Sequence, residues 1–342
     1  MKAMILKKIA PVEEKPLELE DLPIPQPGPE QIRVKISACG VCHTELDEIE
    51  GRLQPNLPII LGHEIVGKVE SLGSEVTKFK SGERVGIGWI NSACGKCQFC
   101  QEGNENLCSE FHGTGCHVNG GYSEYTVVSE DFAYPIPDRF SDSQAAPLLC
   151  AGAIGYRALR LTNLRDGQIL GLFGFGASAH IVIQIVKHKY SNSKVFVFTR
   201  PRQEMHQNLA RKLGADWIGA TGETPPARPS CAIDFTPAWK PVVEALRVLE
   251  RGGRLVINAI RKEEKDKDTF LKLDYPTHLW LEKEIKSVAN ITRSDAEEFL
   301  PLAAEIPIIP EVQEFKLEEV NKALLLLKQG NIRGAGVLKM PE

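Results

Sequence analysis

The chain of 342 residues is long enough for two domains, and its 42% hydrophobic and 25% charged residues are typical of a globular protein. A net charge of −4 gives no basic face, which argues against nucleic acid and anionic membranes as partners. No apolar run is long enough to span a bilayer, and nine cysteines, several at metal-ligand spacing, favour reduced thiols in the cytoplasm.

The first part of the chain, through about residue 150, has the pattern of irregular β structure. The proline-rich segment 22–30, LPIPQPGPE, cannot be helical and leads into a predicted strand at 32–38. Further short strands are predicted at 62–69 and 83–87, with glycine and serine turns between them. Many glycines among short strands suit a barrel-like domain.

A candidate metal site lies within this β-rich part. Cys42 is followed about twenty residues later by the pair His63-Glu64, and Cys150 stands far downstream, just before a glycine-rich motif. Cysteine thiolate and neutral imidazole are ligands that Zn²⁺ prefers, and three protein ligands with an open fourth position are typical of catalytic zinc. The sequence therefore predicts a metal site next to a cofactor site.

A second metal site is predicted between residues 91 and 109. Four cysteines occur within fifteen residues, at Cys94, Cys97, Cys100 and Cys108. This spacing is typical of a closed Cys₄ zinc site with a structural role; the alternative is a disulfide knot, which the expected cytoplasmic setting disfavours.

From about residue 151 the pattern changes to alternating strands and helices. The apolar segment QILGLF is followed by a GxGxxA motif and a second apolar segment, which predicts a strand, a phosphate-binding turn and a helix. The motif residues expected to contact the cofactor are Gly174, Gly176, Ala177 and Ser178. Later strand and helix patterns extend the series, so we predict a doubly wound Rossmann domain over 151–289.

The end of the second strand of that domain bears on cofactor choice. A fold that selects NAD usually has an acidic residue there for the ribose 2′-hydroxyl. This chain instead has Thr199, Arg200 and Arg202. Guanidinium groups suit a 2′-phosphate, so NADP is favoured over NAD; the alternative is that both arginines are solvated surface charges.

The remaining segments are predicted to return to the β-rich domain. The charged segment 262–268, KEEKDKD, reads as a surface loop because its charges alternate in sign. Helices are expected at 294–304 and 317–329, the second ending at Gly330, and a strand is expected in the segment IRGAGVLKM. The predicted β-rich domain therefore comprises residues 1–150 and 290–342.

Taken together, the segments CHTE, GHE, the four-cysteine lobe, LLCAG and GFGASA, in that order, resemble a zinc-dependent alcohol dehydrogenase of the medium-chain dehydrogenase/reductase superfamily. The resemblance covers nearly the whole chain. It implies an α/β protein with a GroES-like catalytic domain and a Rossmann domain, two zinc ions per chain, an alcohol or aldehyde substrate, and a homodimer or homotetramer.

The resemblance also implies residue roles. Cys42, His63 and Cys150 would bind catalytic zinc, with Glu64 as an alternate ligand and Glu45 orienting the imidazole. Proton transfer is implied from the alcohol through Thr44 toward Asp47, which stands where many relatives carry histidine. His43 would lie near the cofactor pyrophosphate, and Trp89 would line the substrate pocket, unless it is simply a core residue.

Three rival functions remain. A zinc-ribbon nucleic-acid binder would share the cysteine spacing but should be basic. A non-catalytic zinc-binding structural relative would lack the zinc ligands that are present here. A polyol dehydrogenase of the same superfamily commonly uses a carboxylate as third ligand, and Cys150 at that position disfavours this function.

Near the C-terminus the chain departs from the family pattern. Relatives often have, after a glycine, an arginine that reaches the cofactor pyrophosphate, whereas here Arg333 precedes Gly334, and the sequence leaves the role of Arg333 open.

Overall fold

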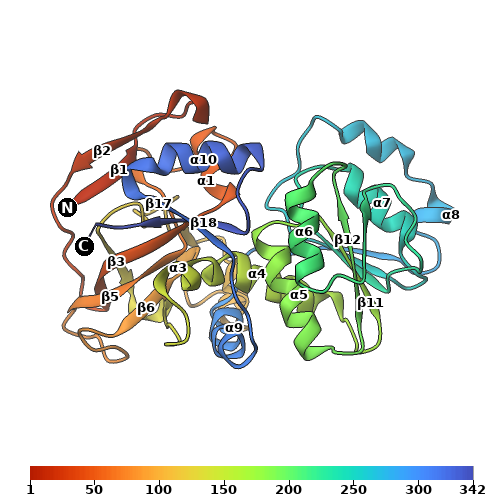
Figure 1. Cartoon of the computed structure of the whole chain (residues 1–342). Coiled ribbons are helices and arrows are strands. Elements are labelled where there is room, and N and C mark those ends of the chain that lie inside the picture. Colours follow the sequence, from red (N-terminus) through yellow and green to blue (C-terminus); the bar gives the residue numbers. More distant parts are fainter. Residues whose placement is uncertain (342) are drawn as a thin grey trace. The chain divides into compact units, whose positions relative to one another are not determined.

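The computed structural model describes residues 1–341, which form two compact units (Figure 1). The first unit comprises Met1–Ala153, Ile291–Ala304 and the segment from Ile309 onward. The second comprises Ile154–Asn290 and the short segment Glu305–Ile308. None of the helices in the described part of the chain combines the length and apolar character needed to cross a membrane.

The first unit is built on a seven-stranded sheet with the order β10-β6-β5-β3-β18-β17, and β9 also pairs with β3. The long strand β3 (Gln31–Val41) alternates between buried and more exposed residues over its first half and is almost entirely buried over its second. The C-terminal strand β18 (Ala335–Lys339) lies antiparallel to β3 and parallel to β17 (Val312–Lys316), so the predicted C-terminal strand is confirmed. The other strands of this sheet are β5 (Ile65–Leu72), β6 (Arg84–Ile87), β9 (Tyr125–Ser129) and β10 (Ala133–Pro135).

Smaller sheets and several helices complete the first unit. The small sheets contain β2-β1-β4 (Leu17–Asp21, Lys2–Leu6, Ile59–Ile60) and β7-β8 (Ile90–Ser92, His112–Gly113). The helices are α1 (His43–Ile49), α2 (Gln98–Gln101), α3 (Asp142–Ala145), α9 (Arg293–Glu305) and α10 (Val320–Gln329). Helix α10 ends at Gly330, as the sequence predicted. The left-handed conformation of Gly330 (φ 71°) lets its N–H group bond to backbone oxygens of the last helical turn. Helices α1 and α10 contact each other.

The second unit is a parallel sheet of six strands with the order β13-β12-β11-β14-β15-β16. Its strands are β11 (Ile169–Phe173), β12 (Lys194–Thr199), β13 (Trp217–Ala220), β14 (Cys231–Asp234), β15 (Arg254–Ile257) and β16 (Glu284–Ser287). The helices are α4 (Ala151–Thr162), α5 (Ala177–Lys189), α6 (Glu204–Lys212), α7 (Lys240–Val248) and α8 (Tyr275–His278). Helix α6 contacts β12 and β13, and α7 contacts β11, β14 and β15. The predicted fold class is confirmed.

The strand order places a topological switch at β11. The chain runs from β11 to β12 and β13 on one side, then returns to add β14, β15 and β16 on the other. In sheets of this kind, ligands bind beyond the carboxyl ends of the strands at the switch point. The glycine-rich motif follows β11 directly and therefore lies at this position.

The segment 262–268 begins as the predicted loop, and Glu264 and Lys265 are exposed, but its first residue is not a surface charge. The Lys262 side chain is only 7% exposed and pairs with Asp234, which is fully buried. The reason is that a buried carboxylate at the end of β14 requires a nearby cation, which the alternation of charges cannot reveal. From Lys267 onward the segment forms a 3₁₀ helix (Lys267–Lys272).

Candidate metal and active site

Four potential ligands converge within the first unit. The Sγ atoms of Cys42 and Cys150, a ring nitrogen of His63 and a carboxylate oxygen of Glu64 all lie within 4.8 Å of one another. Cys42 immediately precedes α1, Cys150 precedes α4, and His63 and Glu64 lie between β4 and β5. Three separate segments therefore meet at one point.

Glu45 ties two of these segments together. One of its carboxylate oxygens accepts a hydrogen bond from the Cys42 backbone N–H at 2.8 Å, and the other lies 2.6 Å from His63 Nδ1. Both side chains of this ion pair are buried. Because Glu45 faces Nδ1, the Nε2 atom of the imidazole is the nitrogen left for a metal ion, which is the usual arrangement of a metal-bound histidine.

The donor set fits Zn²⁺ in its chemistry. A hydrogen bond with Cys150, together with His63, outweighs burial and holds the pKa of the Cys42 thiol well below its usual value. The pKa of the Cys150 thiol is raised by the same hydrogen bond and by burial. One thiol is thus poised as thiolate while the other needs a nearby cation to ionise, and a zinc ion would supply that cation.

Gly40 makes room for Glu64. A Cβ atom at position 40 would lie 1.9 Å from Glu64 Oε2, so no other residue fits without displacing the carboxylate. Burial and the nearby Cys42 raise the pKa of Glu64 well above its usual value. The carboxylate is therefore held beside the cysteine ligands in a protein environment that favours its neutral form.

Trp89 packs against this site. Its ring meets the His63 imidazole edge to face, with centroids 5.0 Å apart, and the side chain is only 5% exposed. A Cβ atom at Gly113 would lie 3.0 Å from the indole, so the ring is enclosed on that side as well. Trp89 therefore contacts one of the candidate ligands directly.

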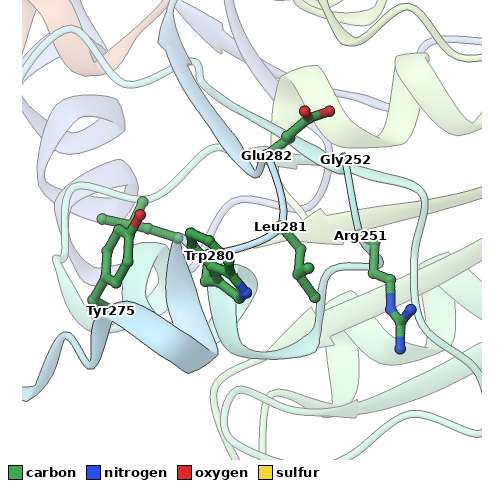
Figure 2. A pocket seen from close by; sticks show the side chains of 7 residues that line it. Arg251, Gly252, Tyr275, Trp280, Leu281 and Glu282 are labelled. Atoms are coloured by element: carbon green, nitrogen blue, oxygen red, sulfur yellow. The ribbon is translucent and has the colours of Figure 1, made fainter.

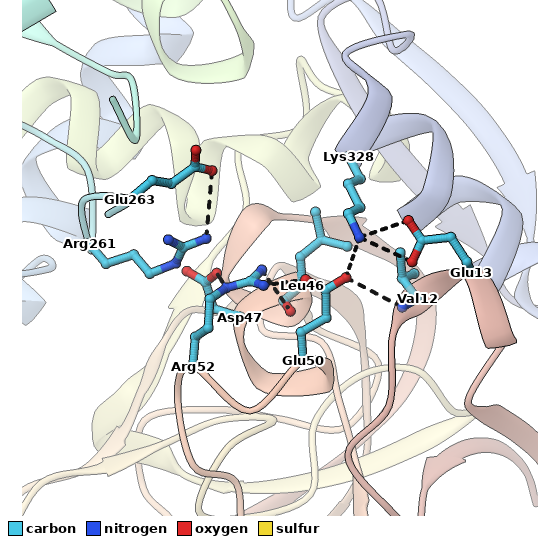
Figure 3. A network of polar contacts seen from close by, with 9 residues as sticks. All are labelled: Val12, Glu13, Leu46, Asp47, Glu50, Arg52, Arg261, Glu263 and Lys328. Carbon is cyan, nitrogen blue, oxygen red and sulfur yellow. Dashed lines mark hydrogen bonds and ion pairs between the residues drawn. The ribbon is translucent and has the colours of Figure 1, made fainter. Parts of the chain in front are cut away.

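The predicted proton-transfer residues lie on α1, next to the cluster. The Thr44 hydroxyl is buried and lies 3.6 Å from Cys42 Sγ, while His43 is exposed at the first position of the helix. Asp47 is buried and accepts a hydrogen bond from Arg52 Nε at 2.7 Å (Figure 3). The carboxylate expected at the end of the relay is therefore already engaged by a guanidinium group.

The same figure shows a second group of charges beside α1. Lys328, on α10, forms ion pairs with Glu13 and Glu50, and Glu50 also pairs with Arg52 (Figure 3). These contacts anchor α10 to the end of α1. They are partly exposed, so each contributes little stability.

The four-cysteine lobe also forms a compact cluster. The sulfur atoms of Cys94, Cys97, Cys100 and Cys108 lie within 4.8 Å of one another, and none of the nine cysteines, all within the described residues, forms a disulfide. The N–H groups of Lys96 and Cys97 lower the pKa of Cys94 to about 7. N–H groups directed at sulfur are appropriate for a site that holds thiolates around a metal.

The glycine-rich turn has the geometry of a phosphate-binding loop. Gly174 has φ 86°, which favours glycine, and no atom lies within 4 Å of a Cβ placed on Gly176. Ala177 begins α5, so backbone N–H groups of its first turn face the space above Gly176. Ser178 differs from its neighbours, because its hydroxyl lies 2.6 Å from a Cβ placed on Gly155 and thus faces α4.

Of the three residues at the end of β12 that were expected to choose between NAD and NADP, one is buried and two are exposed. Thr199 is buried, and its hydroxyl oxygen accepts a hydrogen bond from Gln207 Nε2 at 3.0 Å. Arg200 and Arg202 are exposed, and no ion pair joins either of them to another residue in the described part of the chain. Two guanidinium groups are therefore available at this strand end.

Sequence reasoning missed Glu48. This side chain lies one helical turn after Glu45, is fully buried, and neither of its oxygens has a well-formed hydrogen bond among residues 1–341. Burial, reinforced by the Glu45 carboxylate, raises the pKa of Glu48 well above its usual value. The sequence gave no clear signal, because Glu48 is one of several acidic residues in this segment and only the fold shows that α1 is buried almost all round.

Arg333, whose role the sequence left open, forms an ion pair with Glu311 at 3.3 Å and is half exposed. The pair joins the segment before β17 to the segment before β18. In this position the guanidinium group supports the C-terminal strands.

Comparisons with known proteins agree with the geometry of the first unit. Residues 28–138 match the alcohol dehydrogenase GroES-like domain family. The chain is 40% identical to a "probable alcohol dehydrogenase AdhA" of Mycobacterium tuberculosis, over 99% of this chain and 97% of that protein. It is 33% identical to an alcohol dehydrogenase of Geobacillus stearothermophilus, over 99% and 100% of the two chains.

A solved structure shows the same similarity. The alcohol dehydrogenase from the archaeon Aeropyrum pernix superposes with a TM-score of 0.86 at 27% identity, covering 99% of this chain and 100% of that one.

Proposed function

Because the chain belongs to the zinc-dependent alcohol dehydrogenases of the medium-chain dehydrogenase/reductase superfamily, which are oxidoreductases acting on alcohols, we propose that it transfers hydride between a small alcohol or aldehyde and NAD(P). The observation that carries the proposal is the convergence of two thiols, an imidazole and a carboxylate within 4.8 Å. This donor set suits a catalytic zinc ion with a position open to substrate.

We assign three residues of this cluster, Cys42, His63 and Cys150, to a catalytic zinc ion, with Glu64 as an alternate ligand. When bound, the zinc ion supplies Lewis-acid polarisation of the substrate oxygen. The four cysteines of the lobe would hold a second zinc ion with a structural role, because four thiolates close the coordination sphere. The proposal is therefore two zinc ions per chain.

The residues of α1 would orient the ligands and move the proton. Glu45 fixes both the Cys42 backbone and the His63 ring. The Thr44 hydroxyl, beside Cys42 Sγ, would accept the proton of the alcohol and release its own proton in the direction of Asp47. Asp47 would pass the proton to solvent, and its ion pair with Arg52 keeps the carboxylate oriented for this step.

The second unit would bind the dinucleotide, which supplies the hydride acceptor at its nicotinamide ring. Gly174, Gly176 and Ala177 would receive the pyrophosphate at the start of α5. Arg200 and Arg202 would bind the 2′-phosphate of NADP, which is the preferred cofactor in this proposal. Because both metal sites require thiolates, we expect the protein to work in a reducing compartment, the cytoplasm.

The test combines metal analysis with steady-state kinetics on primary, secondary and aromatic alcohols and both cofactors. We expect two zinc ions per wild-type chain and alcohol-dependent reduction of NAD(P). Cys42→Ser should abolish turnover and remove one zinc ion while the melting temperature changes little. Cys231→Ser, a buried cysteine outside both clusters, is the control and should retain both. One zinc ion in fully metallated wild-type protein would overturn the assignment.

We also propose that two copies of the chain associate through strand β16. All four residues of this edge strand are exposed, and an uncovered edge carries unpaired N–H and C=O groups. Close by, Tyr275 (60% exposed) and Trp280 (54%) lie next to each other (Figure 2), with Ile285 on the strand itself. A homodimer, or a homotetramer built from it, would cover these apolar groups. Ile285→Lys should shift the mass measured by light scattering to that of a single chain.

A further inference from the structure

A buried ion pair links the carboxyl ends of β14 and β15 in the second unit. Asp234, the last residue of β14, is fully buried, and the Lys262 side chain, five residues after β15, is 7% exposed. Lys262 Nζ donates to Asp234 Oδ2, to the backbone oxygen of Thr236 at 2.8 Å and to that of Ala238 at 3.0 Å. All three protons of the ammonium group therefore have acceptors.

These contacts immobilise the loop 235–239 between β14 and α7. Asp234 Oδ1 accepts hydrogen bonds from the N–H and the hydroxyl group of Thr236, at 3.0 and 2.8 Å. The Glu263 N–H donates to the backbone oxygen of Pro237 at 2.7 Å, and the Trp239 N–H donates to Asp266 at 2.9 Å. The segment after β15 thus binds the loop along its whole length.

The loop adjoins the phosphate-binding turn. A Cβ atom at Gly174 would lie 2.9 Å from the Thr236 Cγ2 methyl group, so Thr236 packs on the first glycine of the motif. The loop also follows β14, which lies on the opposite side of β11 from β12 and its arginines. In a doubly wound fold the two halves of the sheet bind the two halves of the dinucleotide, so the loop adjoins the nicotinamide half.

A buried ion pair rarely gives net stability, because the desolvation of two charges offsets their attraction, and apolar residues of similar size often do as well. What the pair provides here is geometry: one ammonium group fixes two carbonyl groups and one carboxylate group of a loop beside a ligand site. We propose that Lys262 and Asp234 are positioning residues that hold the loop 235–239 in the conformation that receives the nicotinamide half of the cofactor. This inference rests on the proposed binding of NAD(P).

The test compares binding of whole and partial cofactors to the metallated full-length protein. In Lys262→Met, the dissociation constant of NADPH, measured by fluorescence titration, should rise about tenfold, equivalent to about 1.4 kcal/mol. The dissociation constant of 2′,5′-ADP, which lacks the nicotinamide half, should change less than about twofold. Hydrogen exchange of the amides in 235–240 should accelerate in the variant without ligand.

The matched control is Lys283→Met. Lys283 Nζ also bonds two backbone oxygens, those of Leu246 at 2.7 Å and Thr277 at 2.9 Å, but it stands before β16, at the amino end of the sheet. This variant should bind NADPH and 2′,5′-ADP as the wild type does. If Lys262→Met does not fold, Asp234→Asn serves instead, because it keeps the size and an acceptor while removing the charge.

Each outcome decides one question. If the wild type binds neither these two ligands nor their NAD counterparts, NADH and 5′-ADP, the proposed function is refuted, and this inference with it; a wild type that binds only NADH and 5′-ADP is tested with that pair instead. If the wild type binds both and Lys262→Met, or Asp234→Asn in its place, binds them unchanged or loses both equally, the positioning role is overturned while the proposed function stands. Selective loss of the whole dinucleotide supports the role.

Discussion

The preference for NADP is the prediction that the structure allows to be worked out furthest. Arg200 and Arg202 are exposed at the end of β12 and are not engaged in ion pairs within the described residues. Two unit charges 4 Å apart attract by ~1 kcal/mol in water and ~4 kcal/mol near a protein surface. Exposure and physiological salt place each arginine at the lower end, so the pair should favour NADP about tenfold.

The perturbation is Arg200→Ala, alone and with Arg202→Ala. Loss of ~0.7 kcal/mol, half of the ~1.4 kcal/mol that corresponds to tenfold, should reduce kcat/KM for NADP about threefold per arginine and leave kcat/KM for NAD nearly unchanged. Added salt should reduce the NADP value of the wild type more than the NAD value. Thr199→Asp should reverse the preference, because the carboxylate accepts from the ribose, repels the 2′-phosphate and retains a donor in Gln207.

The assay is kcat/KM for each cofactor at a fixed alcohol concentration. Arg211→Ala is the control, since Arg211 is an exposed arginine near the end of α6 whose side chain donates a hydrogen bond to Asn208. Two results together would refute the reasoning: a wild type that prefers NAD, and an Arg200→Ala variant with unchanged values for both cofactors. These arginines would then be surface charges only.

Three other changes have distinct expected outcomes. Cys97→Ser should lower the melting temperature and the zinc content while the remaining folded protein stays active, and loss of activity without loss of stability would contradict a structural role. Trp89→Ala should raise KM for small alcohols and favour bulkier ones, because the ring that packs on His63 is removed; unchanged relative kcat/KM across chain lengths would make Trp89 a core residue only. The melting temperature of Glu48→Gln should rise relative to that of the wild type as the pH is raised from 5 to 8. A difference in melting temperature between the two proteins that does not change with pH would contradict the raised pKa of Glu48.

The sign of the Glu48 prediction follows from proton binding. The folded-state pKa of Glu48 is raised by burial, so between the unfolded and folded pKa values the native state holds a proton that the unfolded state has lost. Over this window the contribution of Glu48 to the free energy of unfolding therefore falls with rising pH, by up to ~1.4 kcal/mol per pH unit, whereas a glutamine at this position does not titrate.

Features with local signatures could be predicted from the sequence. The four cysteines of the lobe lie within fifteen residues, and the glycine-rich turn directly follows a predicted strand, so local spacing is enough to suggest each of these two features. The set that includes Cys150 required the order of several motifs along the chain, because its members are separated by more than a hundred residues.

Features that depend on tertiary burial could not be predicted. Lys262 and Glu48 are charged residues in charge-rich segments, and charged residues are usually solvated. Only the fold shows that Asp234 lies opposite Lys262 and that α1 is enclosed almost all round. Likewise, the hydrogen bond from Gln207 to Thr199 depends on how α6 packs against β12.

The position of β18 has a consequence for synthesis of the protein. This strand lies between β3 and β17, so the central sheet of the first unit joins segments separated by almost three hundred residues. On the ribosome, β3 emerges early, and the part of its edge that pairs with β18, residues 38–41, stays uncovered until residues 335–339 have been made. The second unit, whose sheet is complete by Ser287, can fold in the meantime. The unit that contains the two clusters of candidate metal ligands is therefore the last to be finished.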